Sequence, residues 1–431
     1  MEGNWHSGKL SDLTEILMGQ SPSGETCNSQ HLGIPLLNGP TEFSSHHPIP
    51  VQFTIDPKKI AELDDILFCV RGSTTGRMNW SDQKYAIGRG IAAIRHKQGS
   101  EYKHFIRGLL ELKLPLLLTI ATGSTFPNIS KDQLLSLPCD IPPLSEQKAI
   151  AHILGTLDDK IELNQQMNET LEAMARAIFK SWFVDFDPVR AKMEGRQPAG
   201  MDAATADLFP YEFEESSLGL IPKGWLYKPA ETICSIGIGK TPPRKESEWF
   251  SNSYHDIRWA SIRDMGGSGT FISDTKEYLV SEAITRFNVR VVPDHTVLLS
   301  FKLTIGRVAI TDGEMTTNEA IAHFKLDNKI DISSEYLYLY LKAFDYNQLG
   351  STSSIAEATN SKIIKAMPIL IPDSELMKKF TNQVANIFAR IKSNQKESYT
   401  LTTIRDTLLP KLMSGEIRVK EAEKIINNKL S

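Results

Sequence analysis

The amino-acid sequence predicts an α+β protein in which two mixed α/β domains stand in tandem repeat, separated by two long helices that form an antiparallel coiled coil. Residues recur along the chain at offsets of 220 and then 230 positions, as in a duplicated domain. Each copy ends in apolar residues with heptad spacing, which is typical of a coiled coil. Before each heptad series, short apolar runs alternate with Gly, Pro, Asn and Ser, which indicates strands and loops.

The two copies share residues along most of their length. Trp5/Trp225, Gly19/Gly239 and Pro22/Pro242 match at 220, and Gly76–Arg77/Gly306–Arg307, Ile91/Ile321, Pro138/Pro368 and Ile141–Pro142/Ile371–Pro372 match at 230. The predicted parts are a first domain (1–144), a central helix that serves as spacer and partner-binding element (145–183), a linker (184–224), a second domain (225–373), a C-terminal helix (374–417) and a charged tail (418–431).

Within each domain, apolar and β-branched runs predict short strands. They are Gly33–Leu37, Ile66–Val70 and Gly90–Ile94 in the first copy, and Ile257–Ile262, Thr296–Phe301 and Ala320–Phe324 in the second. The longest apolar stretch, around Leu114–Ile120, is also predicted to be strand-like. It falls short of the ~18 apolar residues that a membrane span needs, and the N-terminus lacks a signal layout, so we expect a soluble, cytoplasmic protein.

The seam of each long helix follows a 4,3 spacing, and such a seam needs a partner helix. Its members are Ile150, Leu154, Leu157, Ile161, Asn164, Asn168, Leu171, Ala175 and Ile178 in the first helix, and Phe380, Val384, Ile387, Ile391, Asn394, Ser398, Leu401, Arg405 and Leu408 in the second. An antiparallel pair would bring Asn164 to Asn394 and fix the register; the alternative is that both amides are solvated. Phe179, Trp182 and Phe183 would indicate a partner surface if exposed.

Prolines and bulk composition set further limits. Four prolines between Val184 and Gly224 predict a surface linker without helix, and Pro410 is expected to interrupt the second helix. The tail from Arg418 is expected to be helical or frayed. The net charge of −4 neither favours nor excludes nucleic acid, and four scattered cysteines suggest neither a zinc site nor a disulfide framework.

Two strings resemble catalytic motifs and are better explained by structure. Cys234–Thr241 reads CSIGIGKT, but cysteine stands where a phosphate-binding loop needs its first glycine. Asp373–Glu375 could offer carboxylates to a metal, yet it lies at a helix start, where such residues cap free amides. No methyltransferase motif, Ser-His-Asp order or paired histidine set occurs. The sequence therefore predicts no catalytic or metal-binding residues.

Basic loops rich in amides and hydroxyls are the remaining candidates for function. Arg and Lys suit phosphates and guanine edges, whereas Asn and Gln can pair with adenine; the alternative is a solvated charged surface. The candidate DNA contacts are Gln20, Ser21, Arg71, Ser73, Thr74, Arg77, Asn79 and Arg89 in the first copy, and Lys240, Thr241, Arg244, Arg263, Lys302, Thr304 and Arg307 in the second.

The layout resembles the specificity subunit of type I restriction–modification systems across nearly the whole chain. Ile141–Lys192 is similar to the family's central region, Asp207–Trp225 to its entry into the second recognition domain, and Leu408–Val419 to its C-terminal signature. Ser124–Gln147 also matches, and Thr359–Leu376 is a looser version of it. The resemblance adds Asn128, Lys131, Asn360 and Lys362 as candidate DNA contacts.

That resemblance implies a non-catalytic reader of double-stranded DNA, in which each domain recognises half of an interrupted target and the helices set the spacing. Two methyltransferase subunits would clasp the helices, and restriction subunits would join the full complex. S-adenosylmethionine, ATP and Mg²⁺ would belong to those partners, with no cofactor in this chain. Two alternatives remain: a protein–protein adaptor, whose DNA binding would be absent or indifferent to salt, and a self-contained nuclease or nucleotide-driven enzyme, active alone with metal or ATP.

Overall fold

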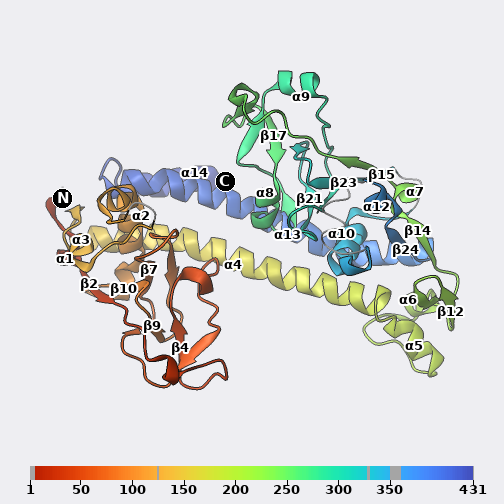
Figure 1. The fold of residues 1–431 in the computed structure, drawn as a ribbon, viewed down its shortest axis with the longest axis horizontal. Helices are drawn as coiled ribbons and strands as arrows, with labels where there is room; N and C mark the ends of the chain where they lie inside the picture. The colour runs from red at the N-terminus through yellow and green to blue at the C-terminus, as the bar shows by residue number, and fades with distance from the viewer. Residues whose placement is uncertain (1–4, 124–125, 328–330, 350–360, 431) are drawn as a thin grey trace. The chain divides into compact units, whose positions relative to one another are not determined.

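The computed structural model describes residues 5–123, 126–327, 331–349 and 361–430 (Figure 1). The chain forms two compact units. Unit 1 comprises Met1–Asn164 and Glu397–Ser431, and unit 2 comprises Gln165–Lys396. Each of the long helices, α4 (Leu144–Phe183) and α13 (Ser374–Met413), therefore contributes to both units.

Unit 1 contains three sheets. An antiparallel sheet has the order β2-β10-β7-β8, a mixed sheet has the order β3-β5-β4-β9-β6, and β1 pairs with β11. The strands are β1 (His6–Lys9), β2 (Thr14–Met18), β3 (Cys27–Asn28), β4 (Ile34–Leu37), β5 (Gln52–Thr54), β6 (Ile60–Ala61), β7 (Ile66–Cys69), β8 (Met78–Trp80), β9 (Tyr85–Ile87), β10 (Ile91–His96) and β11 (Pro138–Ile141). The helices besides the long pair are α1 (Leu10–Leu13), α2 (Lys103–Ile120), α3 (Lys131–Leu135) and α14 (Val419–Leu430).

Strand β10 shows why the antiparallel sheet lies inside unit 1. Successive side chains of a strand point to opposite faces, and here both faces are covered. Ala92 and Ile94 pack into the cluster that includes α2 and the helix pair, whereas Ile91 and Ala93 pack against the mixed sheet. The continuous apolar run is thus a strand buried on both sides, and the three strands predicted in this domain are confirmed.

Unit 2 repeats this plan with four sheets. Their orders are β15-β23-β20-β21-β18, β16-β19-β17-β22, β12-β13 and β14-β24. The strands are β12 (Phe213–Ser216), β13 (Gly219–Pro222), β14 (Leu226–Pro229), β15 (Cys234–Ile238), β16 (Phe250–Ser251), β17 (Ile257–Ala260), β18 (Phe271–Ile272), β19 (Glu277–Leu279), β20 (Val297–Ser300), β21 (Val308–Thr311), β22 (Thr316–Thr317), β23 (Ile321–Leu326) and β24 (Pro368–Ile371). The shorter helices among the described residues of this unit are α5 (Asp187–Met193), α6 (Ala203–Asp207), α7 (Ala230–Ile233), α8 (Ile262–Gly267), α9 (Ser281–Phe287), α10 (Ser334–Ala343) and α12 (Ser361–Ala366).

The long helices run antiparallel within each unit, as predicted. In unit 1, Asp158 of α4 pairs with Arg405 of α13, and Asn164 further along α4 pairs with the earlier residue Glu397. The seam residues are buried in the units' cores: Leu157, Ile161 and Leu401 in unit 1, and Ala175, Phe380, Val384 and Ile391 in unit 2, where Leu171 and Ile387 are partly buried.

The amide pair predicted between Asn164 and Asn394 is wrong. Both residues are buried, with exposures of 0% and 1%, so the alternative of solvated amides is wrong as well. Asn164 Nδ2 donates to Glu397 Oε2 at 2.8 Å, and Asn394 Nδ2 donates to Asn168 Oδ1 at 2.9 Å. The register differs from the predicted one by about one helical turn.

The segment predicted as a surface linker is folded into unit 2. It contains helices α5 and α6 and the hairpin β12–β13, and its Phe186, Val189, Phe209 and Ile221 are buried in the unit's core. Pro188 does not prevent α5 because it stands in the first turn, where a missing N–H costs no hydrogen bond. Phe179, Trp182 and Phe183 are buried in the same core and so provide no exposed partner surface.

Two further expectations about helices need correction. Residues 114–120 are not a strand but the end of helix α2, with Pro115 inside it. The prediction was wrong because an apolar run alone does not distinguish a buried helix from a strand. Helix α13 continues through Pro410 and ends at Met413, four residues before the predicted end. The tail, which was expected to be helical or frayed, is helical: it forms α14, whose Ala422 is buried against the core of unit 1.

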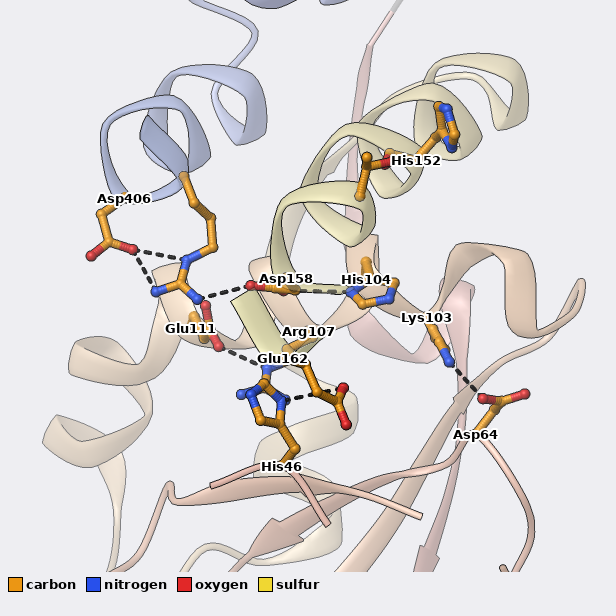
Figure 2. Close-up of polar contacts among 12 residues, drawn as sticks. His46, Asp64, Lys103, His104, Arg107, Glu111, His152, Asp158, Glu162 and Asp406 are labelled. Carbon is orange, nitrogen blue, oxygen red and sulfur yellow. Dashed lines mark hydrogen bonds and ion pairs between the residues drawn. The ribbon is translucent and has the colours of Figure 1, made fainter. Parts of the chain in front are cut away.

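A polar joint attaches the first domain to the helices within unit 1 (Figure 2). Asp158 accepts a hydrogen bond from Arg405 Nη1 at 2.8 Å, and its other oxygen lies 3.5 Å from His104 Nδ1 on α2. One turn further along α4, Glu162 lies 3.7 Å from His46 Nδ1 and 3.1 Å from His47 Nε2. We call these side chains the polar joint. All of them except Arg405 border a cavity of about 230 Å³.

An aromatic joint occupies the corresponding place in unit 2. Phe388 of α13 packs against Phe271 and Tyr338, with ring centroids 6.3 Å and 5.8 Å apart. One turn further along, Lys392 pairs with Asp312 at 2.8 Å, and Gln395 Oε1 accepts from the Phe271 N–H at 3.1 Å. Among the described helices, none is long and apolar enough to cross a membrane.

Candidate nucleic-acid interface

The antiparallel sheet of unit 1 gathers several predicted contacts at one edge. Its order β2-β10-β7-β8, with each neighbour antiparallel, places the ends of β2 and β7 beside the starts of β10 and β8. The segments that follow or precede these points are Gln20–Ser21, Arg71–Arg77 and Arg89. Backbone topology therefore brings together side chains that are up to about 70 positions apart in the sequence.

Hydrogen bonds hold these segments against one another. The Gln20 N–H donates to the Ile87 carbonyl at 2.8 Å, and the Arg89 N–H lies 3.4 Å from Ser21 Oγ. Arg71 Nε donates to Asn128 Oδ1 at 3.2 Å, which brings the segment before α3 to the same edge. Gln20, Arg71, Ser73, Thr74 and Arg89 are exposed. We call this set, with Ser21 and Asn128, edge 1.

Lys131 stands next to edge 1 at the start of helix α3 and is exposed. Ser130 caps that helix by accepting from the Gln133 N–H at 3.2 Å, while Gln133 Oε1 accepts from the Ser130 N–H at 2.7 Å. This capping box defines where the helix begins. It leaves the Lys131 side chain available for an anion.

Arg77 and Asn79 are already occupied by the protein. Arg77 Nη2 donates to the Phe43 carbonyl at 2.6 Å, and its Nη1 donates to the Pro40 carbonyl at 3.2 Å. Asn79 is 0% exposed, and its Nδ2 donates to the Ser44 carbonyl at 3.1 Å. The prediction that Asn79 contacts DNA is therefore contradicted, because a buried amide cannot reach a base. Through these hydrogen bonds, Arg77 holds the segment of residues 40–44 against the start of β8.

Glycines shared by both copies have a structural reason. Gly76 and Gly306 have φ values of +91° and +88°, a conformation that L side chains rarely adopt. At Gly19 an added Cβ would overlap the Gly88 carbonyl oxygen, and at Gly239 it would overlap the Asn318 carbonyl oxygen. The repeat thus preserves the tight turns that place the edge loops.

Unit 2 has the equivalent edge, which we call edge 2: Lys240, Lys302, Thr304 and the intervening Leu303. The order β15-β23-β20-β21 puts the ends of β15 and β20 beside the starts of β23 and β21. The Lys240 N–H donates to the Thr317 carbonyl at 2.9 Å, and the Phe301 N–H donates to the Ala320 carbonyl at 3.0 Å. Lys240 and Thr304 are exposed, and Lys302 is partly buried.

Three predicted contacts of unit 2 have partners within the protein. Arg244 forms a bidentate pair with Glu277 at 2.7 Å and 3.0 Å, and its guanidinium lies over the Trp259 ring at 4.5 Å. Thr241 Oγ1 donates to Glu319. Arg307 Nη1 donates to the Ile262 carbonyl at 2.7 Å, which ties the start of β21 to helix α8.

The remaining candidates of unit 2 lie on short helices. Arg263 is exposed on α8, next to the residue that holds Arg307. Lys362 is exposed on α12, which packs beside β15. Asn360 lies outside the described residues.

The cationic candidates fall into two groups, those with and those without a carboxylate partner within the protein. Within the described ranges, no ion pair involves Arg71, Arg89, Lys131, Lys240, Arg263 or Lys302. Cys69, directly before the edge 1 loop, is buried, and burial raises the pKa of its thiol. The neutral Cys69 S–H donates to the Arg71 carbonyl at 3.3 Å, so it supports the loop. These cations at edges 1 and 2 are therefore available to attract a polyanion, although edge 2 also carries the carboxylate of Glu319.

Leu303 and Glu319 were not predictable from the sequence. Leu303 is 92% exposed between two polar candidates, and a leucine inside a polar loop is a weak signal without the structure. Glu319 binds Thr241 at edge 2, and only the folded topology brings it there. His46, His47 and His104 of the polar joint also gave no signal, since their carboxylate partners, Glu162 and Asp158, lie more than 50 positions away in the sequence.

Comparisons with known proteins agree with this architecture. The family described as type I restriction modification DNA specificity domain matches residues 2–173 and 222–403. The HindI specificity subunit of Haemophilus influenzae is 32% identical, over 70% of this chain and 73% of that protein. The MjaIX specificity subunit of Methanocaldococcus jannaschii is 25% identical, over 97% of this chain and 94% of that protein. The solved S subunit from M. genitalium matches with a TM-score of 0.57 and 17% identity, covering 96% of each chain, which shows the same fold.

Proposed function

The chain belongs to the type I restriction–modification DNA specificity family, and from that premise we propose that edges 1 and 2 each read one half of a bipartite double-stranded DNA target. The observation that carries this is the repetition of the edge. In both units the loops after two strands and before their antiparallel neighbours meet at one place. Both places carry cations without carboxylate partners in the described residues.

The cationic and hydroxyl side chains of the edges can make different contacts with DNA. Arg71 and Arg89 at edge 1, and Lys240 and Lys302 at edge 2, can meet phosphates or guanine acceptors. Ser73, Thr74 and Thr304 supply hydroxyls that can donate or accept at base edges. The two sets differ in sequence, so the two half-sites are expected to differ.

The long helices are proposed to set the spacing between the half-sites and to dock two methyltransferase subunits. Support comes from their continuity, since α4 and α13 each run 40 residues and contribute to both units. Restriction subunits would complete the assembly. Adenine methylation and cleavage, with S-adenosylmethionine, ATP and Mg²⁺, are assigned to those partners and not to this chain.

The proposal is tested by mapping methylated adenines across the genome of cells with and without this gene. We expect loss of methylation at one interrupted motif, which would identify both half-sites. Unchanged methylation in cells that carry an active methyltransferase partner would contradict the proposal. Binding by the purified complex gives a second measure, because neutralised phosphates make true DNA affinity fall steeply with salt; salt-indifferent binding would favour a protein adaptor.

A further inference from the structure

Leu303 stands at the tip of the loop between β20 and β21 in an unusual conformation. Its φ is +63°, and the Thr304 N–H donates across it to the Lys302 carbonyl at 2.7 Å. A three-residue turn with a positive φ at its centre is a strained γ-turn. Such a conformation is an outlier for a bulky side chain. The packing of the exposed Leu303 side chain does not offset the energetic cost of this conformation.

The surrounding loop holds this turn in place. Ser300, which is 0% exposed, donates from Oγ to the Thr304 carbonyl at 2.6 Å and accepts from the Arg307 N–H at 3.0 Å. The Gly306 N–H donates to the Ser300 carbonyl at 3.0 Å. The turn is thus fixed from both strands. Leu303 is 92% exposed, the highest fraction among the large apolar side chains that the structure describes.

The equivalent position of the other copy carries different chemistry. Residue 303 corresponds to Ser73 at the offset of 230, and in unit 1 the positive φ is taken by Gly72, at +104°. Edge 1 therefore presents a hydroxyl at its loop tip, whereas edge 2 presents an isobutyl group between Lys302 and Thr304. An apolar side chain that is held in water contributes favourable free energy only when it is buried against another apolar group.

We propose that Leu303 is a specificity-determining residue that packs against the C5-methyl group of a thymine in the half-site read by the second domain. This rests on the proposed function. The exposed loop between β20 and β21 would enter the major groove, where the thymine methyl is the apolar group on the base edges. Lys302 and Thr304, on either side, would contact the neighbouring phosphate and base edge.

The test measures binding of the chain, assembled with its methyltransferase subunits, to duplexes that carry the mapped target. Each thymine of the second half-site, on either strand, is replaced in turn by uracil, which removes only the methyl group. For the natural chain we expect one replacement to weaken binding about fourfold. In the Leu303→Ala complex the same replacement is expected to change binding less than about 1.5-fold, because the methyl has lost its partner.

Two variants control for folding and general contact. Leu303→Gly relieves the positive φ and removes the side chain, so it is expected to lose the uracil effect while the chain stays folded. Leu220→Ala removes a leucine that is 59% exposed on the β12–β13 hairpin and is expected to keep the effect. An equal uracil effect in the natural and Leu303→Ala complexes, no uracil effect in the natural complex, or a half-site without thymine would each overturn the inference. If the natural complex bound no sequence specifically, the proposed function itself would fail.

Discussion

Asp158 in α4 and Phe388 in α13 occupy equivalent positions of the repeat, 230 residues apart, but they attach the two domains to the helices by different chemistry. Asp158 binds Arg405 at 2.8 Å and faces His104 at 3.5 Å. Phe388 packs between the rings of Phe271 and Tyr338. One turn later the charge is reversed, because Glu162 faces two histidines whereas Lys392 pairs with an aspartate.

This difference shows that a repeat can keep its helix seam while each joint diverges. Seam residues are constrained by the partner helix, so the apolar spacing recurs in both copies. The residues of a joint are constrained only by the domain that they contact. The aromatic joint gains its strength from buried area, which is insensitive to pH. The polar joint depends on charge and geometry.

The pKa of Asp158 shows how the polar joint is balanced. Burial alone would raise the pKa of this carboxyl, but His104 and Arg405 outweigh burial, and the pKa lies below its ordinary value. A lowered folded-state pKa contributes stability above the unfolded-state value of about 3.8 that is lost as the pH falls through the folded-state pKa. The contribution of Asp158 to the joint is therefore present at neutral pH.

The largest expected effect is at the aromatic joint. Phe388→Ala should lower the free energy of unfolding of unit 2 by about 4 kcal/mol, since it leaves a cavity in a core where Phe388 is 2% exposed. Hydrogen exchange would localise the loss to β20, β21 and α10. Arg390→Ala, an exposed neighbour on the same helix, should have little effect. Loss of protection in unit 1 instead would contradict this assignment.

Acidification should weaken unit 2 through its sheet and not through its joint. Burial lowers the pKa of His323 from 6.5 to about 4, and Arg290 adds to this. Between these values the unfolded chain binds a proton that the folded chain does not, so stability falls as the pH drops. The loss should be about 2 kcal/mol between pH 7 and pH 5. Denaturant unfolding of the natural chain and of His323→Gln measures it, and an equal pH slope in both would contradict the assignment.

A smaller effect is expected at the polar joint. Asp158→Asn should destabilise unit 1 by about 1–2 kcal/mol, because it removes the charge that Arg405 and His104 face in a partly buried place. Asp406→Asn is a matched control, since Asp406 binds the same arginine from a side chain that is 61% exposed. Its effect should stay below about 0.5 kcal/mol. Equal losses in the two variants would show that burial of the pair does not matter.

Much of the architecture was predictable because its signals are local or periodic. The repeat, the heptad seam and the six strand runs all follow from spacing along the chain. The helix register was not predictable, because the seam determines which face of each helix is buried but not which turns of the two helices lie opposite each other. Asn164 binds Glu397 and not Asn394. A proline in sequence predicts the absence of a helix, but Pro188 stands in the first turn of α5, where it is tolerated.

The candidate interface was predictable at the level of segments, not of side chains. Composition located the loops that form edges 1 and 2. It could not show that Asn79 is buried against Ser44, or that Arg244 is paired with Glu277, because those partners lie more than 30 positions away in sequence. Leu303 was missed for the opposite reason: its importance comes from exposure and a strained backbone, and neither leaves a composition signal.

We propose that each unit reads one half-site and that the helix pair sets the spacing between the two half-sites. The most direct test inserts one heptad in both helices, after Asn164 in α4 and after Lys396 in α13, and then maps methylated adenines in cells. Seven residues add about 10 Å of helix, or roughly three base pairs. The account predicts that both half-sites are unchanged and that the spacer between them lengthens by about that amount. An unchanged spacer in an active complex, or altered half-sites, would contradict it.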